Sequence, residues 1–100
     1  MRVTILGSGS EGNALLLESG AGSVLVDAGL SFRKLAQRFA AIGRTVPPNI
    51  AAIIVTHSHG DHAANASTYS TRLGCPIRAA EATMPSIRLR PTAQAETFTV

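Results

Sequence analysis

The feature that most constrains this chain is the hexapeptide His57-Ser58-His59-Gly60-Asp61-His62, which holds all three of its histidines. An apolar, β-branched run over residues 50–56 precedes it and is typical of a buried strand. His57 and His59 are two residues apart, so in an extended chain they project to the same side. Imidazole and carboxylate are the usual protein ligands of Zn²⁺. The hexapeptide therefore predicts a metal site where a buried strand ends.

The same motif predicts two ions rather than one. Gly60 permits a sharp change of direction, and Asp61 and His62 then fall at the start of a predicted helix, where a carboxylate is favoured by the helix dipole. Adjacent residues at a helix start point apart, so we assign His57 and His59 to one ion and Asp61 and His62 to the other. Two ions about 3.5–4 Å apart activate a water for attack on phosphoryl or acyl groups. Zn²⁺ is the preferred ion, with Mn or Fe as alternatives.

The string His-x-His-x-Asp-His after an apolar strand resembles the metallo-β-lactamase superfamily. Segments 3–10, 12–14 and 24–29 also follow the order of its N-terminal half. More narrowly, residues 1–82 resemble the bacterial branch of WalJ-type metallo-hydrolases, which is linked to DNA 5′–3′ exonuclease activity. The resemblance implies an α+β class, the αββα sandwich, in which two sheets pack face to face with helices outside. It also implies a metal-dependent hydrolase, and we expect a phosphodiesterase or DNA 5′–3′ exonuclease.

The resemblance also carries individual roles. His57 and His59 match the ligands of the first metal, and Asp61 and His62 match those of the second. Asp61 is in addition expected to be catalytic, by orienting the hydroxide that attacks the substrate. Asp27, in an Asp-x-Gly turn after a strand, resembles the family acid that lies behind the ligands and orients the histidine cluster. The alternative for Asp27 is a turn residue that only ends the strand beside Gly29.

The chain departs from the family in its later ligands. The family completes its site with a further His, a bridging Asp and a final His, whereas this chain has no histidine after His62. We therefore expect residues 1–100 to be a truncated, N-terminal part of one domain, with one apolar sheet face uncovered. We expect the isolated chain to bind metal weakly and to turn over little substrate. The alternative is a non-catalytic remnant that binds little or no metal.

Charge and composition agree with a polyanionic substrate. The net charge is +3, which suits nucleic acid as a partner, although Arg33, Lys34 and Arg38 are also explained as the solvated face of a helix. No apolar run approaches the roughly 20 residues needed to cross a membrane. The single Cys75 is expected to be a small packed hydrophobic residue, and a cytoplasmic location is the default.

The order of elements follows from periodicity and turn residues. Strands are predicted over 2–6, 14–18 and 23–27 as an antiparallel meander, and further strands over 50–56, 76–80 and 96–100. A helix is predicted over 32–42, with Ser31 as its N-cap and Leu35, Phe39 and Ile42 on its apolar face. A second helix is predicted over 62–73, and no regular element is predicted for 83–95.

One rival interpretation concerns the glycine-rich segment Gly7-Ser8-Gly9-Ser10-Glu11-Gly12. It matches the dinucleotide-binding pattern Gly-x-Gly-x-x-Gly, and Asp27 lies near the position of a ribose-binding acid. A parallel crossover of a dozen or more residues, however, does not fit between Asn13 and Ser23. We expect the glycines to form tight turns near the metal loop instead. Ser8, Ser10 and Asn13 then either bond to substrate or cap those turns.

Overall fold

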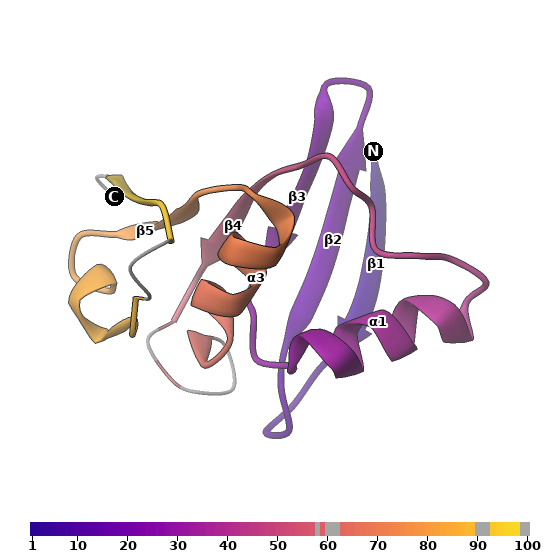
Figure 1. Ribbon diagram of the computed structural model, residues 1–100, viewed down its shortest axis with the longest axis horizontal. Coiled ribbons are helices and arrows are strands. Elements are labelled where there is room, and N and C mark those ends of the chain that lie inside the picture. Colours follow the sequence, from indigo (N-terminus) through magenta and orange to yellow (C-terminus); the bar gives the residue numbers. More distant parts are fainter. Residues whose placement is uncertain (58, 60–62, 90–92, 99–100) are drawn as a thin grey trace.

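The computed structural model describes residues 1–57, 59, 63–89 and 93–98. In this part of the chain, strands β1 to β6 form one mixed sheet in sequence order, and two α-helices lie against one of its faces (Figure 1). The elements are β1 (Arg2–Gly7), β2 (Ala14–Ser19), β3 (Gly22–Val26), α1 (Phe32–Ala41), β4 (Ile50–Val55), α3 (Ala66–Leu73), β5 (Ile77–Ala80), the 3₁₀ helix η1 (Met84–Ser86) and β6 (Ala95–Phe98).

The directions of the strands determine which strand ends lie at the same edge of the sheet. β1, β2 and β3 pair antiparallel, which confirms the predicted meander. From β3 onward every pairing is parallel, between β3 and β4, β4 and β5, and β5 and β6. The carboxyl ends of parallel neighbours lie at the same edge of a sheet. The residues that follow β3 and β4 are therefore brought together.

Helix α1 forms nearly as predicted. The Ser31 hydroxyl accepts a hydrogen bond from the Lys34 N–H at 3.2 Å and so caps the first turn. Leu35 and Phe39 are fully buried. Ile42 was predicted to share their face and is instead 52% exposed. The reason is that the helix ends at Ala41, so Ile42 no longer follows the helical repeat.

The second predicted helix, over 62–73, is interrupted after Ala63, which is helical and whose N–H donates to the His59 carbonyl at 2.9 Å. Residues 61 and 62 lie outside the described residues, and α3 starts only at Ala66. Asn65 explains the interruption. Its backbone N–H donates to the Ala28 carbonyl at 2.8 Å, and its side-chain amide donates to Gly29 at 3.2 Å. An N–H that bonds to a distant strand end cannot also bond within a helix.

The core lies between the sheet and the two helices. Its largest fully buried side chains come from both layers and are Tyr69, Phe39, Leu16, Leu25, Leu30, Leu35, Ile53, Ile77 and Val55. Cys75 is buried among them, as predicted, and burial raises the pKa of its thiol. On the other face of β1, Val3 and Ile5 are 56% and 70% exposed. The described residues therefore leave this apolar part of β1 uncovered.

The C-terminal strand starts one residue before the predicted segment and runs to Phe98, while residues 99–100 lie outside the described residues. Between β5 and β6 the short 3₁₀ helix η1 occupies part of 83–95, where no element was predicted.

Tyr69 joins α3 to the segment that follows β3. Its buried hydroxyl donates to the Leu30 carbonyl at 2.7 Å, and its ring packs edge-on against Phe32. Burial raises the pKa of the Tyr69 phenol far above its ordinary value of 10.

We expect Tyr69→Phe to lower the free energy of unfolding by about 1 kcal/mol, because the Leu30 carbonyl loses its donor. Because the pKa is raised in the folded state, the stability that Tyr69 contributes is complete below pH about 10 and is lost as the pH rises above that value. Tyr69 is the chain's one tyrosine, and there is no tryptophan. Its ultraviolet titration should therefore coincide with alkaline unfolding, and a phenol that ionises near pH 10 in the folded protein would contradict this.

Candidate metal centre

The site begins with Asp27, the first residue after β3. Its backbone has φ 68°, the left-handed region that ordinary residues rarely adopt but that Asp and Asn tolerate. Its N–H still continues the parallel ladder by donating to the Ile54 carbonyl at 2.7 Å. This conformation ends β3 one residue earlier than predicted. It leaves the Asp27 carboxylate, only 7% exposed, beside the end of β4.

The buried carboxylate is bonded to the residue that precedes His57. The Thr56 backbone N–H donates to Asp27 Oδ1 at 2.8 Å. The Thr56 hydroxyl lies 2.9 and 2.7 Å from Asp27 Oδ1 and Oδ2, and 2.8 Å from His57 Nδ1. Asp27, Thr56 and His57 thus form one hydrogen-bonded chain across the carboxyl ends of β3 and β4.

The number of available protons determines which group donates and which accepts in each of these hydrogen bonds. An ionised carboxylate only accepts hydrogen bonds, so the single hydroxyl proton of Thr56 goes to Asp27. The Thr56 oxygen can then only accept from His57, which places the ring proton on Nδ1. The unprotonated nitrogen is therefore Nε2, and this atom carries the lone pair that a metal ion requires. The arrangement fits a metal-ligating histidine, whose other nitrogen characteristically donates to a fixed partner.

The structure places two of the four predicted ligands. His57 and His59 are both exposed at the end of β4, as a ligand that must reach an ion requires. Asp61 and His62 lie outside the described residues. Among residues 1–57, 59, 63–89 and 93–98, no group of three or more His, Cys, Asp or Glu side chains forms a metal cluster.

Thr56 is the residue that sequence reasoning missed. A threonine at the end of an apolar run is ordinary for a strand, so its residue type gave no reason to separate it from its neighbours. The available signal was its position directly before the first histidine, with Asp27 expected at the end of a neighbouring strand. Only the parallel pairing of β3 and β4 shows that the hydroxyl lies between them.

The glycine-rich segment lies at the edge of the sheet where β3 and β4 end. It leads from β1 into the antiparallel β2, so the dinucleotide-binding interpretation, which needs a crossover helix here, is wrong. Gly9 and Gly12 have φ values of 97° and 143°, which confirms tight turns. The Asn13 side chain bonds to both the N–H and the carbonyl of Gly9, so it caps the turn. The Asn13 carbonyl accepts from the Gly29 N–H at 3.0 Å, which connects the turn to the segment after Asp27.

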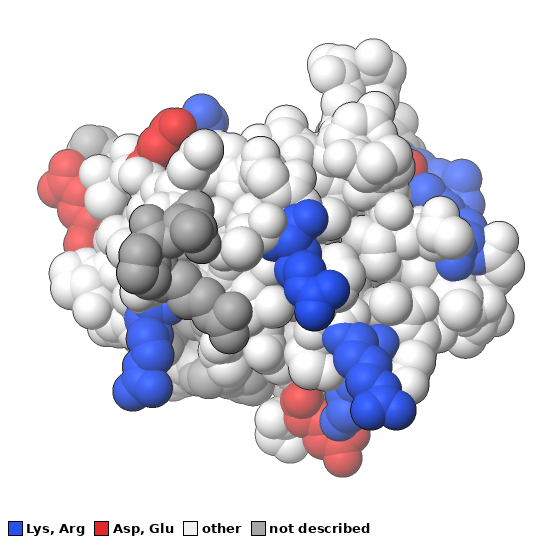
Figure 2. Space-filling view, in the orientation of Figure 1, with Lys and Arg blue, Asp and Glu red and all other residues white. Residues whose placement is uncertain are grey.

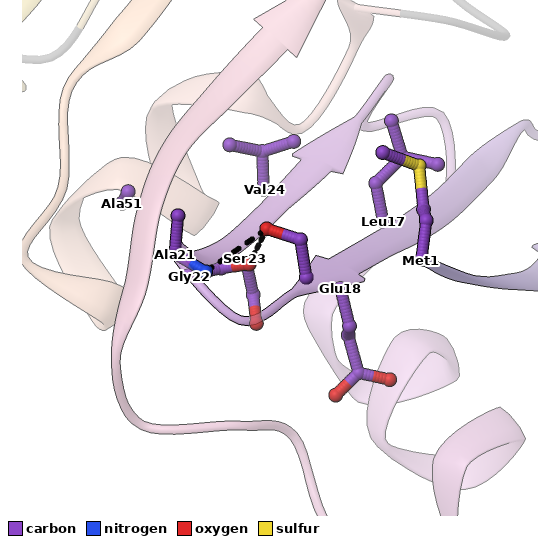
Figure 3. Close-up of a pocket in the computed structure, with 9 residues that line it drawn as sticks. Met1, Leu17, Glu18, Ala21, Gly22, Ser23, Val24 and Ala51 are labelled. Carbon is purple, nitrogen blue, oxygen red and sulfur yellow. Dashed lines mark hydrogen bonds between the residues drawn. The ribbon is translucent and has the colours of Figure 1, made fainter.

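A shallow apolar cavity lies at the opposite edge. Its volume is about 260 Å³, and Leu17, Gly22, Val24 and Met1 contribute to its lining (Figure 3). Because β3 runs from Gly22 towards Asp27, this cavity lies at the start of the strand and the histidines lie beyond its end. The cavity therefore takes no part in the candidate metal centre.

Comparison with known families identifies the fold. The model of the metallo-beta-lactamase superfamily matches residues 7–100. The chain belongs to the metallo-beta-lactamase superfamily. An exodeoxyribonuclease, WalJ of Streptococcus pneumoniae, is 39% identical to this superfamily member over 82 residues, which are 82% of the chain and 30% of the relative. Exodeoxyribonuclease YycJ of Bacillus anthracis is 31% identical over 83 residues, which are 83% of the chain and 31% of the relative.

Solved structures agree with the fold. The metallo-beta-lactamase SMB-1 superposes with a TM-score of 0.69 at 25% identity, covering 94% of this chain and 42% of its own. MEM-A1, a subclass B3 metallo-beta-lactamase from a soil metagenome library, gives 0.73 at 21% identity, covering 96% and 42%. This superfamily member therefore spans less than half the length of the relatives that it matches. None of its described helices has the length and apolar character needed to cross a membrane.

Proposed function

We propose that this chain provides the metal-binding edge of a metal-dependent phosphodiesterase that hydrolyses DNA, most specifically as a 5′–3′ exonuclease. The observation that carries the proposal is the series of hydrogen bonds from Asp27 through Thr56 to His57, because it leaves Nε2 as the His57 nitrogen that is free of a proton and able to bind metal. DNA is favoured as substrate because WalJ and YycJ are both exodeoxyribonucleases. A cytoplasmic location would suit that substrate.

The ligands would divide between two divalent ions, with zinc preferred. His57 and His59 would hold the first ion, and Asp61 and His62 the second, with further ligands and water completing each coordination shell. When bound, such a pair lowers the pKa of water towards 7 and neutralises charge that develops on phosphate oxygens. We also propose that residues 1–100 form an N-terminal part of one metallo-β-lactamase domain.

The chain's own residues would set up this chemistry. Thr56 holds the proton of His57 on Nδ1, and Asp27 holds Thr56 in place. Asp61 would bind metal and orient the attacking water. No covalent nucleophile is required, and Cys75 is unsuited to that role because it is buried and its thiol pKa is raised.

Metal dependence provides the direct test. The complete metallo-β-lactamase domain of which we propose residues 1–100 to be a part, saturated with Zn²⁺ or Mn²⁺, is expected to release mononucleotides from 5′-phosphorylated DNA, with about two ions per domain by elemental analysis. Residues 1–100 alone should bind metal weakly and release little. A chelator should abolish release, because the ions activate the water, and metal added in excess should restore it. The control is the same chelator already saturated with zinc, which should leave hydrolysis unchanged.

Three outcomes are informative. Chelator-resistant hydrolysis would contradict metal dependence. Metal uptake with hydrolysis of other phosphodiesters but not of DNA would support the hydrolase and exclude the exonuclease. Absence of both metal uptake and hydrolysis would favour the alternative of a non-catalytic remnant.

A further inference from the structure

The distribution of charge between Asp27 and Glu81 is strongly asymmetric. Residues 28–80 contain a single acidic residue, Asp61, against the six cations Arg33, Lys34, Arg38, Arg44, Arg72 and Arg78. Both described α-helices, α1 and α3, fall in this stretch and contain no acidic residue. Figure 2 views the face that carries the helices, and it shows acidic side chains towards the periphery while Lys and Arg also lie across the middle.

Two of the six cations are neutralised. Arg44 forms a two-pronged ion pair with Glu18 at 3.0 Å, and Arg78 pairs with Glu96 at 3.1 Å. Among the described residues, the other four have no acidic partner. We call these four the helix patch, and its members are Arg33, Lys34, Arg38 and Arg72.

One contact connects the helix patch across two helices. The guanidinium of Arg72, on α3, lies 5.4 Å from the ring centroid of Phe32, the first residue of α1. Arg33 and Lys34 follow Phe32 directly and are exposed. Arg38 lies one turn after Lys34 and donates to the Leu6 carbonyl at 2.9 Å, which fixes its side chain at the end of β1. The Arg72 guanidinium therefore lies over the residue that directly precedes Arg33 and Lys34.

Helix stability accounts for Arg38 and Arg72, which lie in the last turns of α1 and α3, but not for Arg33 and Lys34. Arg33 and Lys34 occupy the first turn of α1, where the helix dipole disfavours positive charge. Lys34 and Arg38 are four residues apart, where like charges repel. A solvated helix face usually mixes charges of both signs, but α1 has three cations and no acid. Departures from local preference of this kind are expected where a surface binds a ligand of opposite charge.

We infer that the helix patch binds the phosphate backbone of DNA outside the metal centre. The inference rests on the proposed function and extends it by naming the surface that carries the strand. Phe32 follows Asp27 by one short segment, and that segment is bonded to α3 through Asn65 and Tyr69. A DNA strand that leaves the candidate metal centre can therefore continue over the start of α1. Contacts of this type neutralise phosphates without reading bases.

Binding of a fluorescent single-stranded oligonucleotide to the full chain, measured by anisotropy without metal so that no cleavage occurs, tests the inference. We expect Arg33→Gln with Lys34→Gln to weaken binding about tenfold near 0.1 M salt and to reduce the slope of log K against log salt by about 1.4, which is about 0.7 for each lost phosphate contact on a single strand. The matched control is Arg2→Gln with Arg88→Gln, which removes the same charge from exposed positions outside the helix patch. It should leave the slope nearly unchanged. Circular dichroism establishes that both variants are folded.

Equal weakening in both variants would show a general effect of net charge and would overturn the inference. Unchanged binding in the Arg33 and Lys34 variant would overturn it as well. If that variant instead loses binding to phosphatidylserine vesicles but not to DNA, the helix patch belongs to a membrane surface. Metal-dependent DNA hydrolysis by the unchanged protein, measured in parallel, separates the two proposals. If the protein hydrolyses DNA but the Arg33 and Lys34 variant binds DNA as well as the unchanged protein, only the inference about the helix patch is rejected. If the protein neither hydrolyses nor binds DNA, both proposals are rejected.

Discussion

Asp27→Ala is expected to weaken metal binding about 10–100-fold and to lower the free energy of unfolding by about 3 kcal/mol. The substitution removes the carboxylate of Asp27, a residue only 7% exposed, and leaves the N–H and hydroxyl of Thr56 without that acceptor. It also places alanine at φ 68°, in the left-handed region that a β-carbon disfavours. Zinc titration and chemical denaturation measure the two effects separately.

Asp27→Asn is the matched variant. Asparagine tolerates the left-handed backbone and can still accept from the Thr56 N–H, so the fold should be largely retained. Its amide can, however, donate to the Thr56 hydroxyl, which is then able to donate to His57. We expect metal binding to weaken while stability stays near that of the unchanged protein.

The tautomer of His57 distinguishes positioning from simple support of the fold. Nitrogen-15 spectra of the imidazole should show the proton on Nδ1 in the unchanged protein and a mixture of tautomers in Asp27→Asn. Thr56→Val should give the same mixture, since it removes the hydroxyl and keeps the branched shape. An unaltered Nδ1 proton in both variants would reject the assigned role of Asp27 and Thr56.

Gly12→Ala is expected to lower the free energy of unfolding by about 3 kcal/mol, through a clash and a strained backbone together. A β-carbon at Gly12 would lie 2.8 Å from the carbonyl carbon and oxygen of Gly29 and 2.9 Å from Leu30 Cδ2. The backbone φ is 143°, which L-residues rarely adopt. Gly29 cannot easily yield, because its N–H is bonded to Asn13.

The chain offers controls that separate the two causes. Gly9 also has a positive φ, of 97°, but a β-carbon there would meet no atom within 4 Å. Gly20 has neither a clash nor a positive φ. Thermal unfolding should therefore rank the variants with Gly20→Ala least affected, Gly9→Ala intermediate and Gly12→Ala most destabilised. Equal effects at Gly9 and Gly12 would show that close packing against Gly29 contributes nothing.

Local patterns predicted the elements well because each depends on nearby residues. The meander followed from short turns between apolar runs, and α1 followed from Ser31 and the repeat of Leu35 and Phe39. Errors arose where a residue distant in sequence binds a backbone or side-chain group that the local pattern assigns to a helix, and where a helix ends before its apolar pattern does. Asn65 interrupts the predicted helix before α3 because its N–H and amide bond to residues that follow β3. Ile42 is exposed because α1 ends one residue before it.

The sequence alone determined the ligand types and their spacing, because His57 and His59 alternate at a strand end and Asp61 and His62 follow within the same six residues. It also placed Asp27 at a strand end, without deciding whether that carboxylate turns the chain or orients a ligand. Tertiary structure decided which residue that carboxylate contacts. Asp27 and Thr56 are 29 positions apart, and only the parallel pairing of β3 and β4 brings the carboxylate within hydrogen-bonding distance of the hydroxyl. The position of the His57 ring proton, on Nδ1, depends on that contact. A contact between residues so far apart leaves no periodic pattern in the sequence.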